Sequence, residues 1–324
     1  MNLNIPQPEQ QVGFSVLLAQ SRTQFMQDAL LDTVGNLNIS DLDAQLRDYV
    51  PASALQALAK RGLRGELVFP VPMLLEANPY LLGYYRLLLG FSQKAFYSSD
   101  FGTSPFHSME KKGRISPTCH DHIDTLCSSL VTSAEGLVKG LGDAMLSQEL
   151  FDDLTLLTLG PQLRGGANVQ LGAKAIAEVF DVIYDIVSHV ASVTGKNNSI
   201  TLQNAAGRAV LIEFAPDPDI IIREQMPGGT YRNIVAIEVK GGQDFSNIHN
   251  RIGEAEKSHQ KARHDGYTEC WTVVNVDRFD QQKAFTASPS TNRFYRISDL
   301  ASRTGNEYED FKGRILGITG IKSI

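Results

Sequence analysis

The chain contains few cysteines and no long apolar stretch. Only Cys119, Cys127 and Cys270 occur among 324 residues, so we expect no disulfide framework and a reducing cytoplasmic location. No apolar run reaches the roughly 18 residues needed to span a membrane, so we expect no membrane association. Residues 1–11 lack the basic start and apolar core of a signal peptide, which also favours the cytoplasm.

An excess of positive charge is absent as well. The 30 lysines and arginines are outnumbered by 36 aspartates and glutamates, and the formal net charge is −6. This balance disfavours a protein that coats DNA without sequence preference. It is compatible with a site-specific enzyme whose basic residues gather in one cleft, where phosphate contacts make binding salt-dependent. Apolar residues at 42% and charged residues at 20% indicate a globular protein with one large or two modest domains.

Residues 1–150 have the pattern of a mainly helical region, which we expect to serve DNA clamping or dimerisation. Apolar residues recur at helical spacing from Gln11 to Val34, which predicts helical structure there. Ser40 and Pro51 each open a further helix, because both are residue types common at helix starts.

Two segments of this region have their own composition. The aromatic residues of Tyr84–Tyr97 predict packing, with the basic residues Arg86 and Lys94 on the surface of the helical region and contact with a DNA backbone as the alternative. Ser98–Pro117 is polar and contains several glycines and prolines, so it predicts a loop.

Residues 151–324 change character and predict an α/β domain, a mixed sheet flanked by helices. A turn-rich connection is expected at Gly160–Asn168, followed by a long helix over Gln170–Val193. The remaining elements are strands at about 207–214, 219–223, 233–240 and 270–276, with a helix at about 247–264 before the last strand.

The most informative segment is Pro218–Gly242, with the sequence PDIIIREQMPGGTYRNIVAIEVKGG. Two β-branched runs are joined by a Pro-Gly-Gly turn, which predicts a hairpin. Alternation along the second strand places Glu238 and Lys240 on one face and Val239 on the other. Pairing of the strands would bring Asp219 close to Glu238 and Lys240.

Two carboxylates and an ammonium at a strand end are suited to metal-assisted phosphodiester hydrolysis. Asp219 and Glu238, with the backbone carbonyl of Val239, offer the hard oxygen ligands that Mg²⁺ prefers. The metal acts as a Lewis acid and activates a bound water, while Lys240 orients that water and offsets charge on the phosphate. We therefore expect Asp219, Glu238 and Lys240 to be catalytic.

The same pattern also occurs on ordinary strands. A Glu-x-Lys pair is commonly a solvated face with a cross-strand ion pair. Here the charged residues end strongly apolar strands, Pro218 precedes Asp219, and two glycines follow Lys240. Charged groups at the end of a buried strand are costly unless they are paired or bind a metal, which favours a functional site.

Other acids are candidates for the same site. On the helix before the hairpin, Glu178 is preferred over Asp181 as an additional catalytic acid, with a solvated helix face as the alternative. Glu213 and Asp217 compete with Asp219, which is favoured because it enters the apolar run directly.

The helix after the catalytic strand is rich in side chains that contact nucleic acids. Polar residues recur there at three- and four-residue spacing along neighbouring faces, so we expect DNA contacts, with a surface helix of ion pairs as the alternative. The candidates are Asn247, Asn250, Arg251, Glu254, Lys257, Ser258 and Lys261.

A second candidate for DNA contact is the glycine-rich segment from Arg164 to Asn168. Glycines let backbone amides approach a phosphate closely, and a following helix would direct its N-terminus there. Lys174, one turn into that helix, would add positive charge.

Four segments together resemble type II restriction endonucleases of the XcyI group, within the PD-(D/E)xK nuclease superfamily. They are LLGYYRLLLGFSQKAFY, QLRGGANVQLG, the PD…EVKGG core and HNRIGEAEKSHQKA, and the similarity spans residues from about 60 to 275. The core is specific only to the superfamily, whereas the flanking strings are more particular. The resemblance implies a restriction-endonuclease-like core in which Asp219 and Glu238 hold the metal and Lys240 acts on the water.

The resemblance also implies a homodimeric, Mg²⁺-dependent enzyme that cuts both strands of a palindromic site, expected to be CCCGGG. A two-fold dimer presents one active site to each strand of a palindrome. A cognate DNA methyltransferase would be its genetic partner. A site of G·C pairs also suits Arg251 and Glu254, which pair with guanine and cytosine edges.

Two other functions remain open from the sequence. One is a structure-specific repair or recombination nuclease, although such chains are commonly short and basic. The other is a non-catalytic DNA-binding protein of the same fold, which the intact Asp219, Glu238 and Lys240 disfavour.

Overall fold

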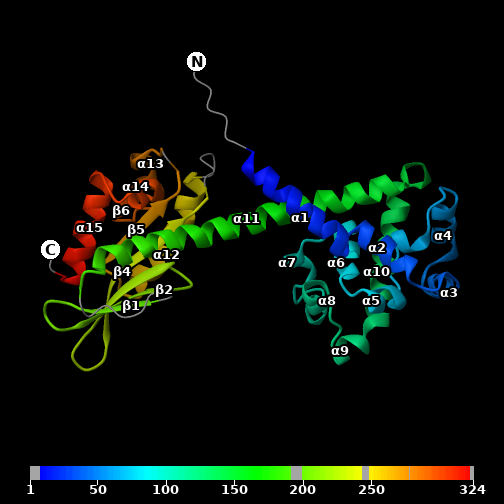
Figure 1. Ribbon diagram of the computed structural model, residues 1–324, viewed down its shortest axis with the longest axis horizontal. Helices are drawn as coiled ribbons and strands as arrows, with labels where there is room; N and C mark the ends of the chain where they lie inside the picture. The colour runs from blue at the N-terminus through cyan, green and yellow to red at the C-terminus, as the bar shows by residue number, and fades with distance from the viewer. Residues whose placement is uncertain (1–7, 191–198, 243–247, 277, 322–324) are drawn as a thin grey trace, which may run out of the picture. The chain divides into compact units, whose positions relative to one another are not determined.

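The structure is a computed structural model that describes residues 8–190, 199–242, 248–276 and 278–321 (Figure 1). The chain divides into two compact units, Met1–Gly165 and Gly166–Ile324. All three cysteines are buried and free. Within the described ranges, no helix combines the length and apolar character needed to cross a membrane.

The first unit is helical. Its helices and 3-10 turns are, in chain order, α1 (Glu9–Phe25), α2 (Gln27–Gly35), α3 (Ile39–Tyr49), α4 (Ala52–Ala59), η1 (Gly65–Leu67), α5 (Pro72–Ala77), α6 (Leu81–Leu88), α7 (Gln93–Phe96), η2 (Ser104–Phe106), α8 (His107–Lys112), α9 (Pro117–His120), α10 (Ile123–Leu141) and η3 (Asp143–Met145).

Local chemistry explains several of these helix starts. The side chain of Asn38 accepts a hydrogen bond from the amide of Ser40 and caps α3, and α4 begins directly after Pro51. The helical structure predicted from Gln11 to Val34 is confirmed and consists of two helices, because the backbone is extended at the buried Met26 and separates α1 from α2. The loop predicted at Ser98–Pro117 is wrong in part, since it contains α8 and the start of α9.

Arg86 is a second correction in this unit, because it is fully buried rather than on the surface. Its guanidinium forms two hydrogen bonds with the carboxylate of Glu110, at 2.9 and 2.7 Å. Gln93 and Tyr97 donate to the same carboxylate, each at 2.7 Å. Burial alone would raise the pKa of Glu110, but the contacts with Arg86, Gln93 and Tyr97 outweigh it and hold that pKa below its usual range.

Helix α11 (Gln148–Val187) is continuous through the segment where the sequence predicted a glycine-rich turn. Pro161 lies inside it and Gly165–Gly166 are helical. Glycine permits a turn without requiring one, and α11 passes through this segment as a helix although residues 160–174 are half-buried or exposed. The predicted turn, and with it a helix N-terminus at this point, is therefore wrong.

The second unit contains one six-stranded sheet and its helices. After the C-terminal part of α11 the elements are β1 (Ser199–Gln203), β2 (Ala209–Phe214), β3 (Ile220–Gln225), β4 (Tyr231–Lys240), α12 (Ile248–His264), β5 (Glu269–Val274), α13 (Gln281–Ala287), β6 (Arg293–Arg296), α14 (Ile297–Ser302) and α15 (Asn306–Thr319).

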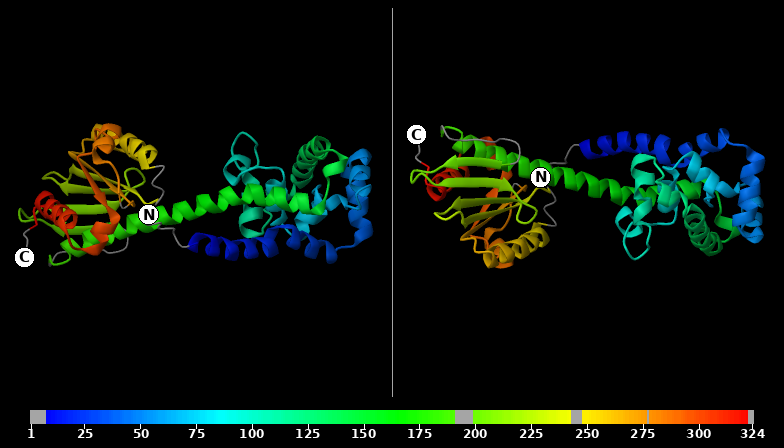
Figure 2. Two further views of the ribbon diagram at one scale, coloured as in Figure 1. Left: turned by 90° about the horizontal axis from the view of Figure 1, so that it is seen from above. Right: turned by 90° about the horizontal axis from the view of Figure 1, so that it is seen from below.

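The sheet is mixed, as the sequence predicted, with the strands in chain order. Strands β1 to β4 are antiparallel neighbours, whereas β4, β5 and β6 are parallel. One face packs against α11, α14 and α15, and the other against α12 and α13 (Figure 2). Because α12 is the crossover from β4 to β5, the carboxyl end of β4 lies where open α/β sheets commonly bind ligands.

Candidate functional site

The predicted hairpin is formed by β3 and β4. Gly228 and Gly229 both have positive φ at its turn, a conformation that glycine adopts without strain. Register pairs Ile220 with Ile237, so Asp219 lies just before the paired part of β3. Its carboxylate accepts a hydrogen bond of 2.7 Å from the amide of Val239. The hairpin thus brings Asp219 to the end of β4.

Glu238 and Lys240 share one face of β4, as the alternation predicted, while Val239 packs in the core on the other face. Glu238 is 6% exposed, and its Oε1 accepts a hydrogen bond of 2.8 Å from Nζ of Lys240. The side chain of Lys240 is 17% exposed, so this ion pair is largely shielded from water. Such shielding strengthens the interaction of both groups with a charged ligand.

The two carboxylates influence each other. Burial, followed by the charge of Glu238, raises the pKa of Asp219 to about 6. The hydrogen bond from Val239 and the charge of Lys240 act in the opposite direction. A buried carboxylate beside a second carboxylate is suited to binding a divalent cation, which offsets the repulsion.

The backbone of Val239 is directed to the same place. In an extended strand the amide and carbonyl of one residue point to the same side. The amide of Val239 points to Asp219, whereas the carbonyl of Lys240 accepts from the amide of Asn275 on the β5 side. The carbonyl of Val239 therefore faces Asp219, beyond the last paired residues of β3 and β4, where it fits a third oxygen ligand.

Two glycines end the strand because neighbouring groups occupy the space of their side chains. A Cβ on Gly241 would lie 2.6 Å from Cβ of Ala175 and 2.7 Å from the carbonyl oxygen of Leu171 on α11. A Cβ on Gly242 would coincide with the guanidinium of Arg251 on α12. Glycine at both positions lets the strand end pass between the two helices.

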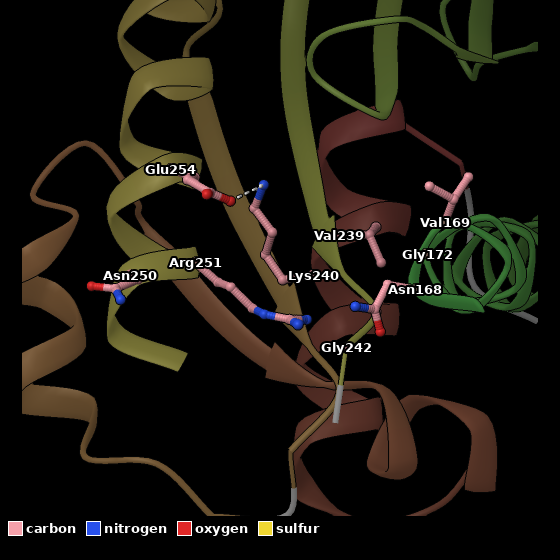
Figure 3. Close-up of a pocket in the computed structure, with 10 residues that line it drawn as sticks. Asn168, Val169, Gly172, Val239, Lys240, Gly242, Asn250, Arg251 and Glu254 are labelled. Carbon is pink, nitrogen blue, oxygen red and sulfur yellow. Dashed lines mark ion pairs between the residues drawn. The ribbon is translucent and has the colours of Figure 1, made fainter. Parts of the chain in front are cut away.

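A cleft of about 490 Å³ opens beside Lys240 (Figure 3). The end of β4 forms its floor, α12 contributes Asn250, Arg251 and Glu254, and α11 contributes Asn168, Val169 and Gly172. Val169 and Gly172 were not predicted from the sequence. Small residues at Gly172 and Ala175, three apart on one helix, were the signal of a close approach.

The competing acids are engaged elsewhere. Glu213 pairs with Arg223. Asp217 pairs with Lys261 at 2.5 Å, and hydrogen bonds from Lys261 and Ser258 lower its pKa.

Glu178 does not join the candidate site. It pairs with Arg303 at 3.4 Å and lines a smaller cavity together with Lys174. Among the described residues, no group of three or more histidine, cysteine, aspartate or glutamate side chains is arranged to hold a metal ion. Asp219 and Glu238 are the carboxylates that the structure brings together at the end of β4. The catalytic role of Glu178 and the DNA contact of Lys174 stay predictions.

The predicted DNA-contacting helix exists as α12, and its candidates separate into groups. Asn250, Glu254 and Lys257 are exposed on it. Ser258 is wrongly predicted as a DNA contact, because it is buried and donates to Asp217. Lys261 is exposed, but its ammonium forms an ion pair with Asp217. Asn247 lies outside the described residues.

The candidates of the glycine-rich segment also separate. Asn168 lines the cleft beside Lys240. Arg164 is an exposed helical residue of the first unit. The predicted cradle of loop amides is wrong, because the amides of residues 164–168 lie inside α11.

A buried polar chain fastens α12 to the sheet. Ser288 donates to the carboxylate of Glu256 at 2.8 Å, and Thr291 links Ser288 to Thr272 at 2.7 and 3.0 Å. Because the ionised Glu256 only accepts, each hydroxyl donates toward it, and His259 must donate its Nε2 proton to Thr272 at 2.8 Å. Burial lowers the pKa of His259 to about 4, so the imidazole is neutral at pH 7.

Comparison with known proteins agrees with this geometry. The model of the XcyI restriction endonuclease family matches residues 16–322. The chain belongs to that family. It is 58% identical to the type II restriction enzyme Cfr9I of Citrobacter freundii over 320 residues, covering 98% of this chain and 97% of the relative. It is 55% identical to the type II restriction enzyme XcyI of Xanthomonas campestris pv. cyanopsidis over 321 residues, covering 98% and 96%.

The protein is therefore a type II restriction endonuclease, a site-specific deoxyribonuclease that acts on double-stranded DNA. Enzymes of this type generally use divalent metal ions. Family membership disfavours both alternatives left open by the sequence, the repair nuclease and the non-catalytic binding protein.

Asp219→Asn is expected to stabilise the metal-free enzyme at pH 8. A raised carboxyl pKa favours the protonated form in the folded state, so the wild type loses stability as pH rises from about 4 to about 6. The asparagine keeps an oxygen for the amide of Val239 and has no charge to lose. We expect a gain of about 1 to 2 kcal/mol at pH 8, reduced from the full linkage value for partial solvent exposure.

Urea denaturation of both proteins in chelator measures this difference. At pH 4 the gain should vanish, because Asp219 is then protonated in wild type as well. An equal loss of stability at both pH values would contradict the assignment. Added divalent cation should stabilise wild type more than Asp219→Asn.

Proposed function

We propose that the enzyme hydrolyses both strands of CCCGGG in a Mg²⁺-dependent reaction and leaves 5′-phosphates. The observation that carries the proposal is the convergence of Asp219, Glu238 and Lys240 at the carboxyl end of β4, in the order and spacing of a PD-(D/E)xK core. The resemblance to the XcyI group supports CCCGGG as the site.

The oxygen groups at the strand end fit Mg²⁺ in number and kind. Asp219 and Glu238 supply charge, and the carbonyl of Val239 supplies a third oxygen, which leaves positions for water and a phosphate oxygen. When bound, the metal supplies Lewis acidity and a more acidic water. The raised pKa of Asp219 supports this fit, because burial and then the charge of Glu238 disfavour the ionised carboxylate when no cation is bound.

Lys240 orients the attacking water and offsets the charge that develops on the phosphate. Its ammonium is placed for this by the 2.8 Å contact with Glu238. The water oxygen forms a bond to phosphorus and the bond from phosphorus to O3′ breaks. The water releases a proton to solvent and the O3′ oxyanion takes one up, which gives a 3′-hydroxyl and a 5′-phosphate.

DNA lies against α12 in this proposal. Asn250, Glu254 and Lys257 are exposed on that helix, and Asn168 lines the cleft from α11. Asn250 and Glu254 are the candidates for base contacts, whereas Lys257 is suited to the phosphate backbone. Removal of a side chain that binds a phosphate should make DNA binding less dependent on salt.

The enzyme acts as a homodimer in this proposal, because two active sites related by a two-fold axis match the two strands of a palindrome. The mainly helical region of residues 1–150, which belongs to the first unit, serves DNA clamping or dimerisation. A cognate DNA methyltransferase protects the host site from cleavage.

Plasmid digestion tests the proposal. Purified enzyme with Mg²⁺ is expected to convert a plasmid carrying two CCCGGG sites into two discrete fragments with 5′-phosphate ends. A matched plasmid in which one base pair of each site is changed should stay intact, as should the original plasmid in chelator. Fragments whose mapped ends fall at another sequence would contradict the proposed site, and cleavage in chelator would contradict the metal requirement.

A further inference from the structure

Arg251 extends from the first turn of α12 into the cleft that also contains Lys240 (Figure 3). The residue is half-buried, and its guanidinium lies against the α-carbon of Gly242. Gly242 is two positions after Lys240 on the chain. The guanidinium is therefore placed next to the candidate catalytic lysine by the path of the strand end.

The absence of a side chain at Gly242 determines this placement. A Cβ at that position would coincide with the guanidinium, so any other residue would force Arg251 to move. Gly253, on the same helix, has no atom within 4 Å of an added Cβ. An added side chain would therefore displace Arg251 at Gly242 but not at Gly253.

The charged groups around Lys240 and Arg251 indicate the charge of the ligand that the cleft binds. The ammonium of Lys240 is 2.8 Å from Glu238 and 3.9 Å from Glu254, so it already has two carboxylates near it. In the described part of the chain, no carboxylate forms an ion pair with Arg251. A guanidinium that pairs with no carboxylate of the described residues, in a half-buried cleft, favours an anionic ligand, and the N-terminal end of α12 adds partial positive charge.

Two kinds of DNA group fit a guanidinium, a phosphate and the edge of a guanine. A guanine contact requires the guanidinium to reach into the major groove. Arg251 instead shares the cleft of Lys240, whose reacting partner is a phosphate. We propose that Arg251 binds the non-bridging oxygens of the scissile phosphate and holds it in position for attack by the water that Lys240 orients. This inference rests on the proposed function.

Arg251 acts only as a hydrogen-bond donor in this role. A guanidinium keeps its proton throughout the reaction, so it moves no proton and stabilises the negative charge that grows on the phosphate oxygens. Removing one such preorganised donor typically slows the chemical step by about 10²- to 10³-fold. The loss appears in the cleavage rate of bound DNA rather than in discrimination between sequences.

Single-turnover cleavage with enzyme in excess tests the proposal on a duplex that carries the sequence cut by the wild type. The variants are Arg251→Ala, Arg251→Lys, Gly242→Ala and, as a matched control, Gly253→Ala. Affinity is measured on the same duplex with Ca²⁺ in place of Mg²⁺. Discrimination is measured on duplexes with each base pair of the site changed in turn.

We expect Arg251→Ala to cleave about 10²-fold or more slowly, with less than about 10-fold weaker binding and unchanged discrimination. Guanidinium ion, added below concentrations that unfold the wild type, should partly restore its rate. Arg251→Lys should retain an intermediate rate, because lysine keeps the positive charge but lacks the paired N–H donors of the planar guanidinium. Gly242→Ala should resemble Arg251→Ala, and Gly253→Ala should cleave like wild type.

Two results would overturn the proposal. One is an Arg251→Ala enzyme that cleaves at the wild-type rate. The other is an Arg251→Ala enzyme whose preference for the intact site over a site changed at one base pair falls by about 10-fold or more. That result would make Arg251 a base-reading residue. A wild type that cuts a sequence other than CCCGGG overturns only the proposed site, and the comparison of variants then proceeds on that sequence.

Discussion

Replacement of Lys240 by alanine is expected to slow DNA cleavage by about 10³-fold or more while the protein stays folded and still binds its site. The substitution removes the cation that lies 2.8 Å from Glu238 and orients the water. It also leaves Glu238 and Asp219 without the positive charge that partly offsets their repulsion. Lys240→Arg should not restore the rate, because a guanidinium does not reproduce the compact ammonium.

Single-turnover rates with Mg²⁺, and affinities with Ca²⁺, separate the chemical step from binding. Lys283→Ala is the matched control, since that lysine is exposed on α13 and its ammonium is 3.7 Å from Asp280. It should cleave like wild type. A Lys240→Ala enzyme within about 10-fold of the wild-type rate would remove Lys240 from the chemistry.

Arg86→Ala is expected to destabilise the first unit by about 3 to 5 kcal/mol. Arg86 is completely buried, and it is the cation that balances the buried carboxylate of Glu110. Without it, the hydrogen bonds from Gln93 and Tyr97 remain but the charge is uncompensated. A loss of this size is a large part of the stability of a typical domain.

Chemical denaturation followed by far-UV circular dichroism reports the helical first unit. The fluorescence of Trp271, the single tryptophan of the chain, reports the second unit and serves as an internal reference. Lys94→Ala is the matched control, because Lys94 is exposed on the neighbouring helix α7. The double variant Arg86→Met/Glu110→Leu should recover part of the loss. A change below about 1 kcal/mol in Arg86→Ala would contradict a buried ion pair.

The local sequence pattern was sufficient to predict how Asp219, Glu238 and Lys240 come together. Period-two alternation predicted that Glu238 and Lys240 share a face opposite Val239, and the Pro-Gly-Gly turn predicted the hairpin that brings Asp219 to them. Both are confirmed by the strand register and the hydrogen bonds at the end of β4. These features depend on residues within a few positions of each other or on one tight turn, so the sequence carries them directly.

The errors occurred where distant packing overrides local preference. Gly165 and Gly166 are typical of a turn, yet they lie inside α11, between the buried Leu159 and Val179. Strands β1 and β6 were missed because each is short, with 5 and 4 residues, and is defined by its neighbour in the sheet. Arg86 was assigned to the surface because its partner Glu110 is 24 residues away.

The resemblance of four sequence segments was enough to identify the family. Short-range periodicity and residue type predicted the α/β fold class and the three polar residues that meet at the end of β4. Tertiary structure decided which other polar residues belong with them. It buried Ser258, paired Lys261 with Asp217, and engaged Glu178 with Arg303. It also brought Arg251 and Asn168 into one cleft with Lys240. Such groupings depend on the packing of α11 and α12 around a strand end, which no spacing along the chain specifies.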